Sequence, residues 1–141
     1  MSEQQAIARA IASIAHRGQA DKLGQPYIEH PRRVAERLTD EIEHSAAWLH
    51  DVIEDADVTA RDQLEAGVLP QIVDVVELLT RRPDVPSDEY YERIRESPHA
   101  RAVKLADIAD NTAPWRVAGL DEATQTRLAE KYRKALQALN P

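Results

Sequence analysis

The chain has 141 residues and a net charge of −7, with 43% hydrophobic and 30% charged residues. This size and composition predict a folded domain with a hydrophobic core and exclude a disordered chain. The acidic balance argues against binding to nucleic acid, which relies on many Lys and Arg contacts to phosphates.

The N-terminal segment MSEQQAIARAIASIAHRG has no basic region before an apolar core, and no stretch is apolar for long enough to span a bilayer. We therefore expect a cytoplasmic protein with no membrane partner. A small anionic ligand is compatible with the negative charge if positive charge is supplied locally. The sequence leaves open a homo-oligomer, because a small apolar interface would not be evident in it.

Apolar residues recur at helical spacing, and no stretch alternates apolar with polar residues as a half-buried strand would. Three apolar stripes are Ile7, Ala10, Ile11 and Ile14; Ile72, Val75, Val76 and Leu79; and Leu128, Tyr132, Leu136 and Leu139. These stripes predict an all-α fold.

Helix boundaries are marked by Pro31, Pro70 and Pro98, which suit a first helical turn, and by Ser87 and Asp121, which suit N-caps. No repeat or linker divides the chain, so we expect a compact single-domain bundle over residues 1–141, with about six to eight helices. The predicted helices span residues 3–17, 31–39, 42–54, 59–66, 70–81, 87–96, 99–112 and 122–139.

The helix predicted for residues 42–54 interrupts its apolar run with ionisable residues. His50 and Asp51 are followed one turn later by Glu54 and Asp55. Residues four apart share a helix face, so we expect His50 to lie over Glu54 and Asp51 over Asp55. Buried carboxylates need hydrogen-bonded partners or a cation, and this pattern therefore indicates a site.

Two other helices carry polar residues at comparable places. His30 immediately precedes Pro31, and from a helix entrance its imidazole can project into a neighbouring cavity. Asp107 follows an apolar stretch, with Asn111 one turn later and Lys104 one turn earlier. A carboxylate in such surroundings needs a partner.

Because the chain has no cysteine, a metal ion would be held by His, Asp or Glu. His30, His50, Asp51 and Asp107 supply two nitrogens and two carboxylates, which suits a first-row divalent metal with one or two positions left for water. Mn²⁺ is the first expectation, with Fe²⁺ and Zn²⁺ as alternatives.

The segments HRGQADKLGQPYIEHPRRVA, AAWLHDVIEDADVT and VKLADIADNT resemble three signature regions of the hydrolase domain of RelA/SpoT-type alarmone enzymes, members of the HD metal-dependent phosphohydrolase superfamily. The resemblance covers nearly the whole chain and implies an HD-type helical bundle. With no room for a synthetase or regulatory domain, the nearest kin would be the stand-alone small alarmone hydrolases.

The resemblance also implies roles for individual residues. It assigns His30, His50, Asp51 and Asp107 to a manganese ion, Glu54 and Asp55 to the attacking water, and Asn111 to the substrate. The implied reaction is hydrolysis of a nucleotide 3′-phosphoester, releasing pyrophosphate from (p)ppGpp or its adenine equivalent (p)ppApp.

The phosphates of such a substrate need positive charge close to the site. With the metal, Lys22, Arg17 or Lys104 could supply it. Lys104 could equally pair with Asp107, and Tyr27 suits either packing beneath the site or contact with a ribose.

Two departures from the family pattern affect the substrate. Asp21 precedes Lys22 where the family commonly has an arginine that stacks on guanine, and Asp110 replaces a histidine common in the long enzymes. An adenine alarmone, NADPH or a nucleoside monophosphate therefore remain alternatives. A non-catalytic nucleotide sensor is a further alternative, although Glu54 and Asp55 argue against it.

Overall fold

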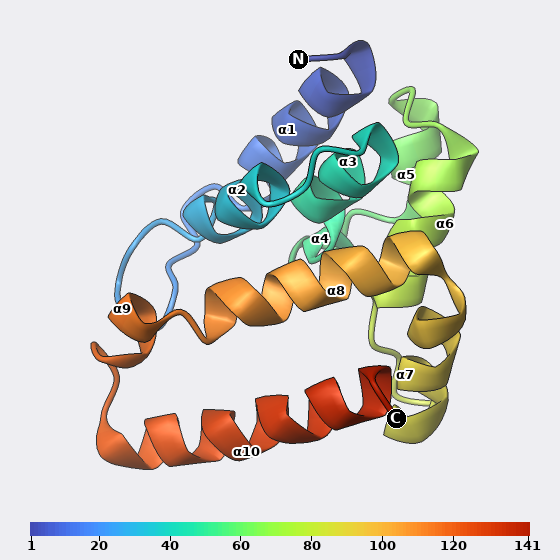
Figure 1. Cartoon of the computed structure of the whole chain (residues 1–141). Helices are drawn as coiled ribbons and strands as arrows, with labels where there is room; N and C mark the ends of the chain where they lie inside the picture. The colour runs from blue at the N-terminus through green and yellow to red at the C-terminus, as the bar shows by residue number, and fades with distance from the viewer.

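The computed structural model describes all 141 residues, which form ten helices and no strand (Figure 1). The helices are α1 (Glu3–Ala15), α2 (Glu29–Glu36), α3 (Glu41–Leu49), α4 (Val52–Ala56), α5 (Ala60–Glu65), α6 (Pro70–Leu79), α7 (Ser87–Glu96), α8 (Pro98–Asn111), α9 (Pro114–Val117) and α10 (Glu122–Leu139). The all-α prediction is confirmed. The count differs because the helix predicted for residues 42–54 is divided and the short α9 was not predicted.

Side-chain caps begin several of these helices. Asp121 accepts a hydrogen bond from the backbone N–H of Thr124, which confirms its predicted role as the N-cap of α10. The N-cap prediction for Ser87 is wrong, because Pro86 takes that position and Ser87 is the first residue of α7. The Ser87 hydroxyl instead accepts a hydrogen bond from Arg81, 2.8 Å away.

The core is built around α3, which packs against α1, α2, α6 and α8. Ala46, Ala47 and Leu49 of α3 are fully buried. The apolar stripe predicted for α6 is confirmed, since all four of its residues are buried: Ile72, Val75, Val76 and Leu79. This core fixes the positions of the helices that carry the polar residues singled out above.

The stripe predicted for α1 is displaced from the observed buried face. Ala8 and Ala12 are fully buried, whereas the side chain of Ile14 is 65% exposed. Ile7 and Ile11 are only partly buried, at the edge of the core. The small alanine side chains allow α1 and α3 to pack closely. The larger isoleucines of α1 therefore lie at the edge of this contact or in solvent.

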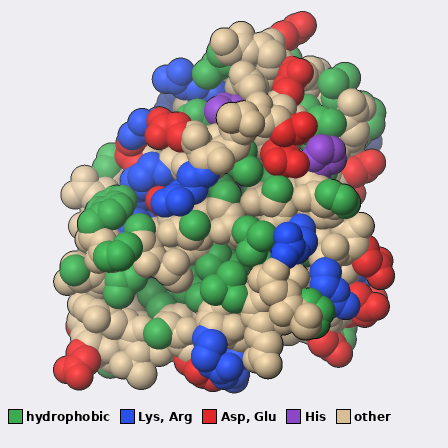
Figure 2. All heavy atoms as spheres, in the orientation of Figure 1, with side chains coloured by type: hydrophobic (Ala, Val, Ile, Leu, Met, Phe, Trp, Pro, Cys, Tyr) green, Lys and Arg blue, Asp and Glu red, His purple; other side chains and the backbone are tan.

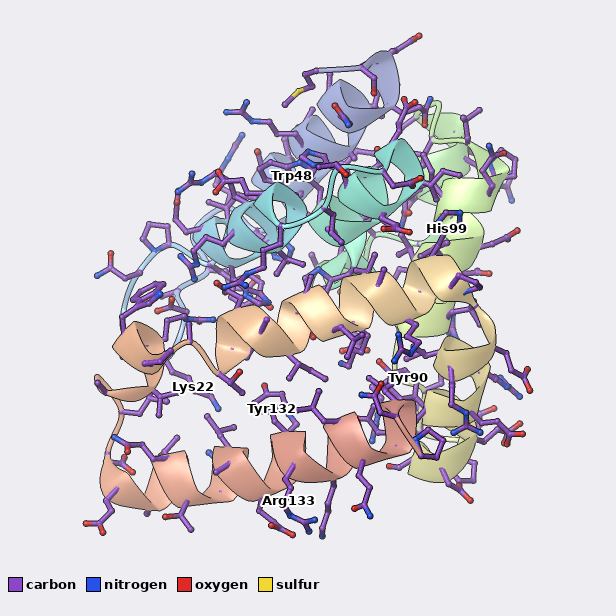
Figure 3. The ribbon with its side chains drawn as sticks, in the orientation of Figure 1. Lys22, Trp48, Tyr90, His99, Tyr132 and Arg133 are labelled. Atoms are coloured by element: carbon purple, nitrogen blue, oxygen red, sulfur yellow. The ribbon has the colours of Figure 1, made fainter.

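The last helix, α10, runs alongside α8 and packs against α7 (Figure 1). Tyr132 points from α10 toward α8, whereas Arg133 points away from it (Figure 3). Figure 2 shows hydrophobic side chains gathered along the seam between α8 and α10. Of the stripe predicted here, Leu128 and Leu139 are buried, but Leu136 is 40% exposed. None of the ten helices combines the length and apolar character needed to cross a membrane.

Candidate active site

His50 and Asp51 lie at a break between two helices, because α3 ends just before them and α4 begins just after them. Nδ1 of His50 is 2.6 Å from the carbonyl oxygen of Ala47, the acceptor that the Asp51 backbone N–H would use in a continuous helix. A side-chain donor that takes this carbonyl competes with the helical hydrogen bond. This competition accounts for the division of the predicted helix.

Donation through Nδ1 leaves Nε2 of a neutral His50 with a lone pair. Nε2 is buried without a hydrogen-bond partner. It lies 3.0 Å from Oδ2 of Asp51 and 3.3 Å from Oδ1 of Asp107. A lone pair and two carboxylates facing one another are stable only with positive charge between them.

His30 approaches the same point from α2. Its Nε2 lies 2.9 Å from Oδ1 of Asp107, and its Nδ1 lies 2.6 Å from Oδ2 of Asp110. The His30 and His50 rings meet edge to face with their centroids 5.4 Å apart. Both histidines and Asp107 are buried. The packing of α2, the end of α3 and α8 thus brings together residues as far as 77 positions apart in the sequence.

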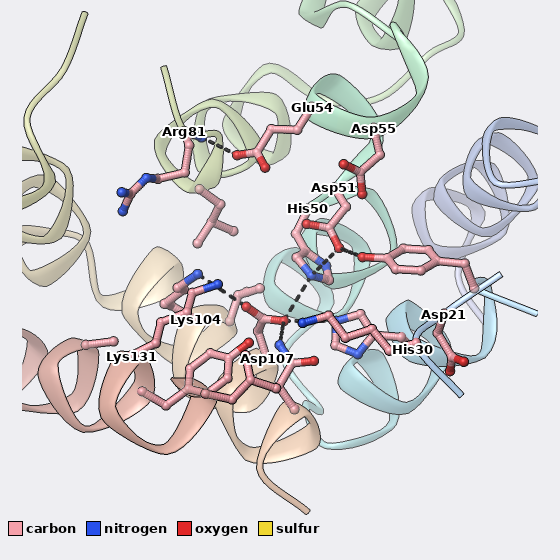
Figure 4. A pocket seen from close by; sticks show the side chains of 18 of the residues that line it. Asp21, His30, His50, Asp51, Glu54, Asp55, Arg81, Lys104, Asp107 and Lys131 are labelled. Carbon is pink, nitrogen blue, oxygen red and sulfur yellow. Dashed lines mark hydrogen bonds and ion pairs between the residues drawn. The ribbon is translucent and has the colours of Figure 1, made fainter. Parts of the chain in front are cut away.

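These residues fit a divalent metal ion. One nitrogen of each histidine and one oxygen of Asp107 all lie within 4.8 Å of one another. Asp51 lies beside them, and Figure 4 shows the four side chains converging on one wall of a cavity. Two imidazoles and two carboxylates are donors that first-row divalent ions accept, and the unpartnered Nε2 of His50 is a nitrogen that such an ion would satisfy.

The clustered charges shift the pKa values of these groups. Burial lowers the pKa of His50, but the negative charges of Asp51 and Asp107 outweigh burial and raise it well above its usual value. Burial would raise the pKa of Asp107, but His50, His30 and Lys104 outweigh burial and hold it well below its usual value. Because a proton and a cation are stabilised by the same carboxylates, metal binding should displace protons.

Glu54 and Asp55 project from α4 into the same cavity, close to Asp51 (Figure 4). A carboxylate oxygen of Glu54 accepts a hydrogen bond from the backbone N–H of Arg81, which fixes its position. Burial raises the pKa of both carboxyl groups, and the negative charge of Asp51 raises them further. A raised pKa makes each carboxylate a better proton acceptor at neutral pH.

The cavity has a volume of about 900 Å³ and is lined by residues from α8 and α10 as well as α4. Four of its lining residues are Lys22, Arg81, Lys104 and Lys131. Lys104 pairs with Asp107 at 3.3 Å, while the other three form no ion pair with a carboxylate. Burial, followed by the positive charges of Lys104 and Lys22, lowers the pKa of Lys131. An acidic chain thus concentrates unpaired positive charge in one cavity, which suits an anionic ligand.

Another part of the cavity wall is apolar and is formed by Leu23, Leu120, Leu128 and Tyr132. Tyr132 projects into the space between α8 and α10 (Figure 3). A planar ring such as a nucleotide base can pack against surfaces of this kind. The cavity therefore offers a single ligand carboxylates and imidazoles, positively charged side chains without a carboxylate partner, and an apolar wall.

Asp21 stabilises its own loop. Its Oδ1 accepts hydrogen bonds from the backbone N–H groups of Leu23 and Gln25, both at 2.9 Å. Its Oδ2 lies 3.6 Å from a guanidinium nitrogen of Arg116. Asp21, which departs from the family pattern, thus has its hydrogen-bond and ion-pair partners within the protein itself.

Nine of the ten site residues predicted from the sequence line this cavity: Lys22, Tyr27, His30, His50, Asp51, Glu54, Asp55, Asp107 and Asn111. Tyr27 donates a hydrogen bond from its hydroxyl to Asp51. Asn111 donates to Oδ1 of Asp107 at 3.1 Å. Arg17 is exposed and is not among the lining residues, so the structure does not bring it to the site.

Sequence reasoning did not find Arg81, Arg116 and Lys131, and it interpreted Tyr132 only as part of an apolar stripe. Lys131 and Tyr132 belong to a helix with no motif, and their proximity to the site depends on how α10 packs. Arg116 lies in the unpredicted α9. The only available signal was the position of Tyr132 on the apolar face of a predicted helix.

A family model described as the HD domain matches residues 8–139. The chain belongs to the HD domain family. An HD domain implies a divalent-metal site, and His30, His50 and Asp107 form the candidate site in this HD domain.

Curated relatives of this HD domain include alarmone hydrolases. The chain is 35% identical to the guanosine-3′,5′-bis(diphosphate) 3′-pyrophosphohydrolase of Vibrio cholerae, over 77% of this chain and 17% of that protein. It is 32% identical to the human enzyme of that name, MESH1, over 92% of this chain and 79% of that protein. The mouse MESH1 is 36% identical over 69% of this chain and 61% of that protein. The chain therefore spans only part of the first relatives it matches.

A solved structure has the same fold as this HD domain. It is described as a metazoan ortholog of SpoT that hydrolyses ppGpp and has a role in starvation responses. The TM-score is 0.80 at 26% sequence identity, and the match covers 99% of this chain and 86% of the other. The similarity thus includes the helices that form both walls of the cavity.

Proposed function

We propose that this chain acts as a single-domain metal-dependent phosphohydrolase that removes pyrophosphate from the 3′ position of a purine nucleotide, (p)ppGpp or (p)ppApp. The observation that carries the proposal is the position of Glu54 and Asp55 beside the four metal-binding candidates, in a cavity with unpaired cations. The names of the bacterial and animal relatives support the same reaction.

Four residues would hold the metal ion: His30, His50, Asp51 and Asp107. We propose Mn²⁺ as the ion, with Fe²⁺ or Zn²⁺ as alternatives, because two imidazole nitrogens and two carboxylates suit each of them. When bound, the ion supplies Lewis acidity toward a phosphoryl oxygen and makes water more acidic. Nδ1 of His50 donates to the carbonyl oxygen of Ala47, so its Nε2 would be the nitrogen that holds the ion.

Glu54 and Asp55 would orient the attacking water and accept its proton. The backbone N–H of Arg81 holds the Glu54 carboxylate, so the proton acceptor is fixed before the substrate binds. The water attacks the phosphorus attached to the 3′ oxygen, the bond between that phosphorus and the oxygen breaks, and pyrophosphate leaves. The 3′ oxygen takes up a proton and becomes the ribose hydroxyl.

Positively charged side chains without a carboxylate partner would bind the phosphates that the metal ion does not contact. Lys22, Arg81 and Lys131 are suited to this role because each lines the cavity without a carboxylate partner. Asn111 and the apolar wall would contact the nucleoside. Residue 21 is an aspartate engaged in its own loop, and not the arginine that commonly stacks on guanine in the family. The proposal includes an adenine base for that reason.

The proposal is tested by incubating the Mn²⁺-loaded protein with ppGpp, ppApp, NADPH and AMP and separating the products by chromatography. The expected result is pyrophosphate from one or both alarmones, abolished by a chelator and restored by Mn²⁺. Orthophosphate from NADPH or AMP, with the alarmones intact, would replace the proposed substrate by another phosphorylated nucleotide. Binding of an alarmone without turnover by the metal-loaded protein would favour the non-catalytic sensor.

A further inference from the structure

Asp110 is an almost fully buried carboxylate that has no part in the function proposed above. Its side chain is only 1% exposed. Oδ2 lies 2.6 Å from Nδ1 of His30 and 2.9 Å from Nη1 of Arg116, while Oδ1 lies 2.9 Å from Nε of Arg33. Buried polar groups are normally hydrogen-bonded, and each oxygen of this carboxylate has at least one partner.

The helical repeat explains why Asp110 reaches His30. Asp107 and Asp110 are three residues apart on α8 and therefore share a face. Asp107 contacts Nε2 of the His30 imidazole, and Asp110 contacts Nδ1. One helix thus presents a carboxylate to each nitrogen of the same ring, one in the cavity and the other behind it.

The two arginines make the burial of Asp110 tolerable. Arg33 comes from α2, the helix that carries His30, and Arg116 comes from α9. Nη1 of Arg116 also lies 3.4 Å from Nδ1 of His30, where it could donate only to an unprotonated nitrogen. The contact between Nδ1 and Asp110 is much shorter at 2.6 Å, which favours a proton on Nδ1 that is donated to the carboxylate.

We infer that Asp110 is a positioning residue that keeps the proton of His30 on Nδ1, so that the lone pair on Nε2 points to the metal ion. The inference rests on the metal centre proposed above. A carboxylate behind a metal-binding imidazole fixes the orientation and tautomer of the ring and makes it a stronger ligand. Arg33 and Arg116 hold the carboxylate in turn, so the assembly links α2, α8 and α9 to the metal centre.

The test is the affinity for Mn²⁺ alone, measured by titration calorimetry on the wild-type chain and on Asp110→Asn. Asparagine keeps the shape but removes the charge and permits either tautomer of His30. We expect the dissociation constant to rise about 10- to 100-fold, with the helical circular dichroism unchanged. Asp21→Asn is the matched control, since Asp21 also lies near Arg116 but does not contact His30, and we expect it to keep wild-type metal affinity.

A second measurement uses only the wild-type chain, so it does not depend on whether a variant folds. In the Zn²⁺-loaded wild-type chain labelled with nitrogen-15, NMR should show a proton on Nδ1 of His30 that exchanges slowly with water. A proton on Nε2 would overturn the inference, and so would a folded Asp110→Asn that binds Mn²⁺ as tightly as the wild type. A wild-type chain that binds no metal would instead reject the metal centre itself, so the two failures are distinguishable.

Discussion

The Tyr27 hydroxyl donates a hydrogen bond to Oδ2 of Asp51, although the two residues are 24 positions apart. Burial, followed by the negative charge of Asp51, raises the pKa of Tyr27 well above its usual value, so the phenol keeps its proton. Tyr27, in the loop before α2, therefore holds a carboxylate of the proposed metal-binding set. Of the two roles that the sequence left open for Tyr27, this contact favours a position beneath the site over contact with a ribose.

Replacing Tyr27 by phenylalanine should weaken the metal centre and spare nucleotide binding. Tyr27→Phe removes one hydroxyl and leaves the ring, so Asp51 loses a donor that orients it. We expect the affinity for Mn²⁺ to fall about 10-fold, with KM for the nucleotide unchanged at saturating metal. A raised KM with unchanged metal affinity would assign Tyr27 to the ribose instead.

Substitutions of Glu54 and of Asp107 should separate loss of catalysis from loss of metal binding. Glu54→Gln should keep wild-type metal affinity but lower kcat about 10²- to 10⁴-fold, the range for loss of a general base. Asp107→Ala removes a carboxylate of the proposed metal site and should lose both metal and turnover. Calorimetry with Mn²⁺, followed by steady-state kinetics, makes the comparison. Glu54→Gln with wild-type kcat would exclude Glu54 as the proton acceptor.

The pH dependence of kcat/KM should reflect the raised pKa values of Glu54 and Asp55. Each accepts a proton only when it is ionised, so activity is lost as pH falls through its pKa. Burial raises both pKa values above the usual 4.5 for Glu and 3.8 for Asp. The acidic limb should therefore lie above pH 4.5. Metal binding measured over the same pH range is the control, because protonation of the proposed metal ligands would also lower activity. A limb below that value would contradict the assignment.

Neighbouring residues of α10 provide a matched test of phosphate binding. Lys131 lines the cavity, whereas Arg133 points away from α8 and pairs with Glu130 at 2.7 Å (Figure 3). Loss of a charged hydrogen bond costs about 1.5 to 3 kcal/mol, so Lys131→Ala should raise KM roughly 10- to 100-fold. Arg133→Ala should leave KM unchanged. Equal KM values for the two variants would remove Lys131 from the substrate site.

Helix periodicity was sufficient to predict the all-α fold class, and the polar residues that interrupt it indicated most of the residues that line the cavity. His50 and Asp51 were found because ionisable residues interrupt an apolar run, and a packed helix rarely carries them there without a function. The break between α3 and α4 was not predictable, since neither proline nor glycine marks it. It depends on a hydrogen bond from the His50 side chain to Ala47.

Residues whose role depends on tertiary packing could not be predicted in the same way. Asp110 was recognised only as a departure from a family pattern, and its contact with His30 joins positions 80 residues apart. Lys131 reaches the cavity because α10 packs alongside α8. Ile14 shows the opposite error, as its spacing fits an apolar stripe but its side chain is exposed.

The most direct test of the central claim is hydrolysis of ppGpp in oxygen-18-labelled water by the Mn²⁺-loaded wild-type chain, with Asp107→Ala alongside. Attack of water on phosphorus at this site predicts one label in the released pyrophosphate, unlabelled GDP, and no products from the variant. Mass spectrometry of the products reads the position of the label. Label in the ribose hydroxyl of GDP, release of orthophosphate in place of pyrophosphate, or full turnover by Asp107→Ala would contradict the account.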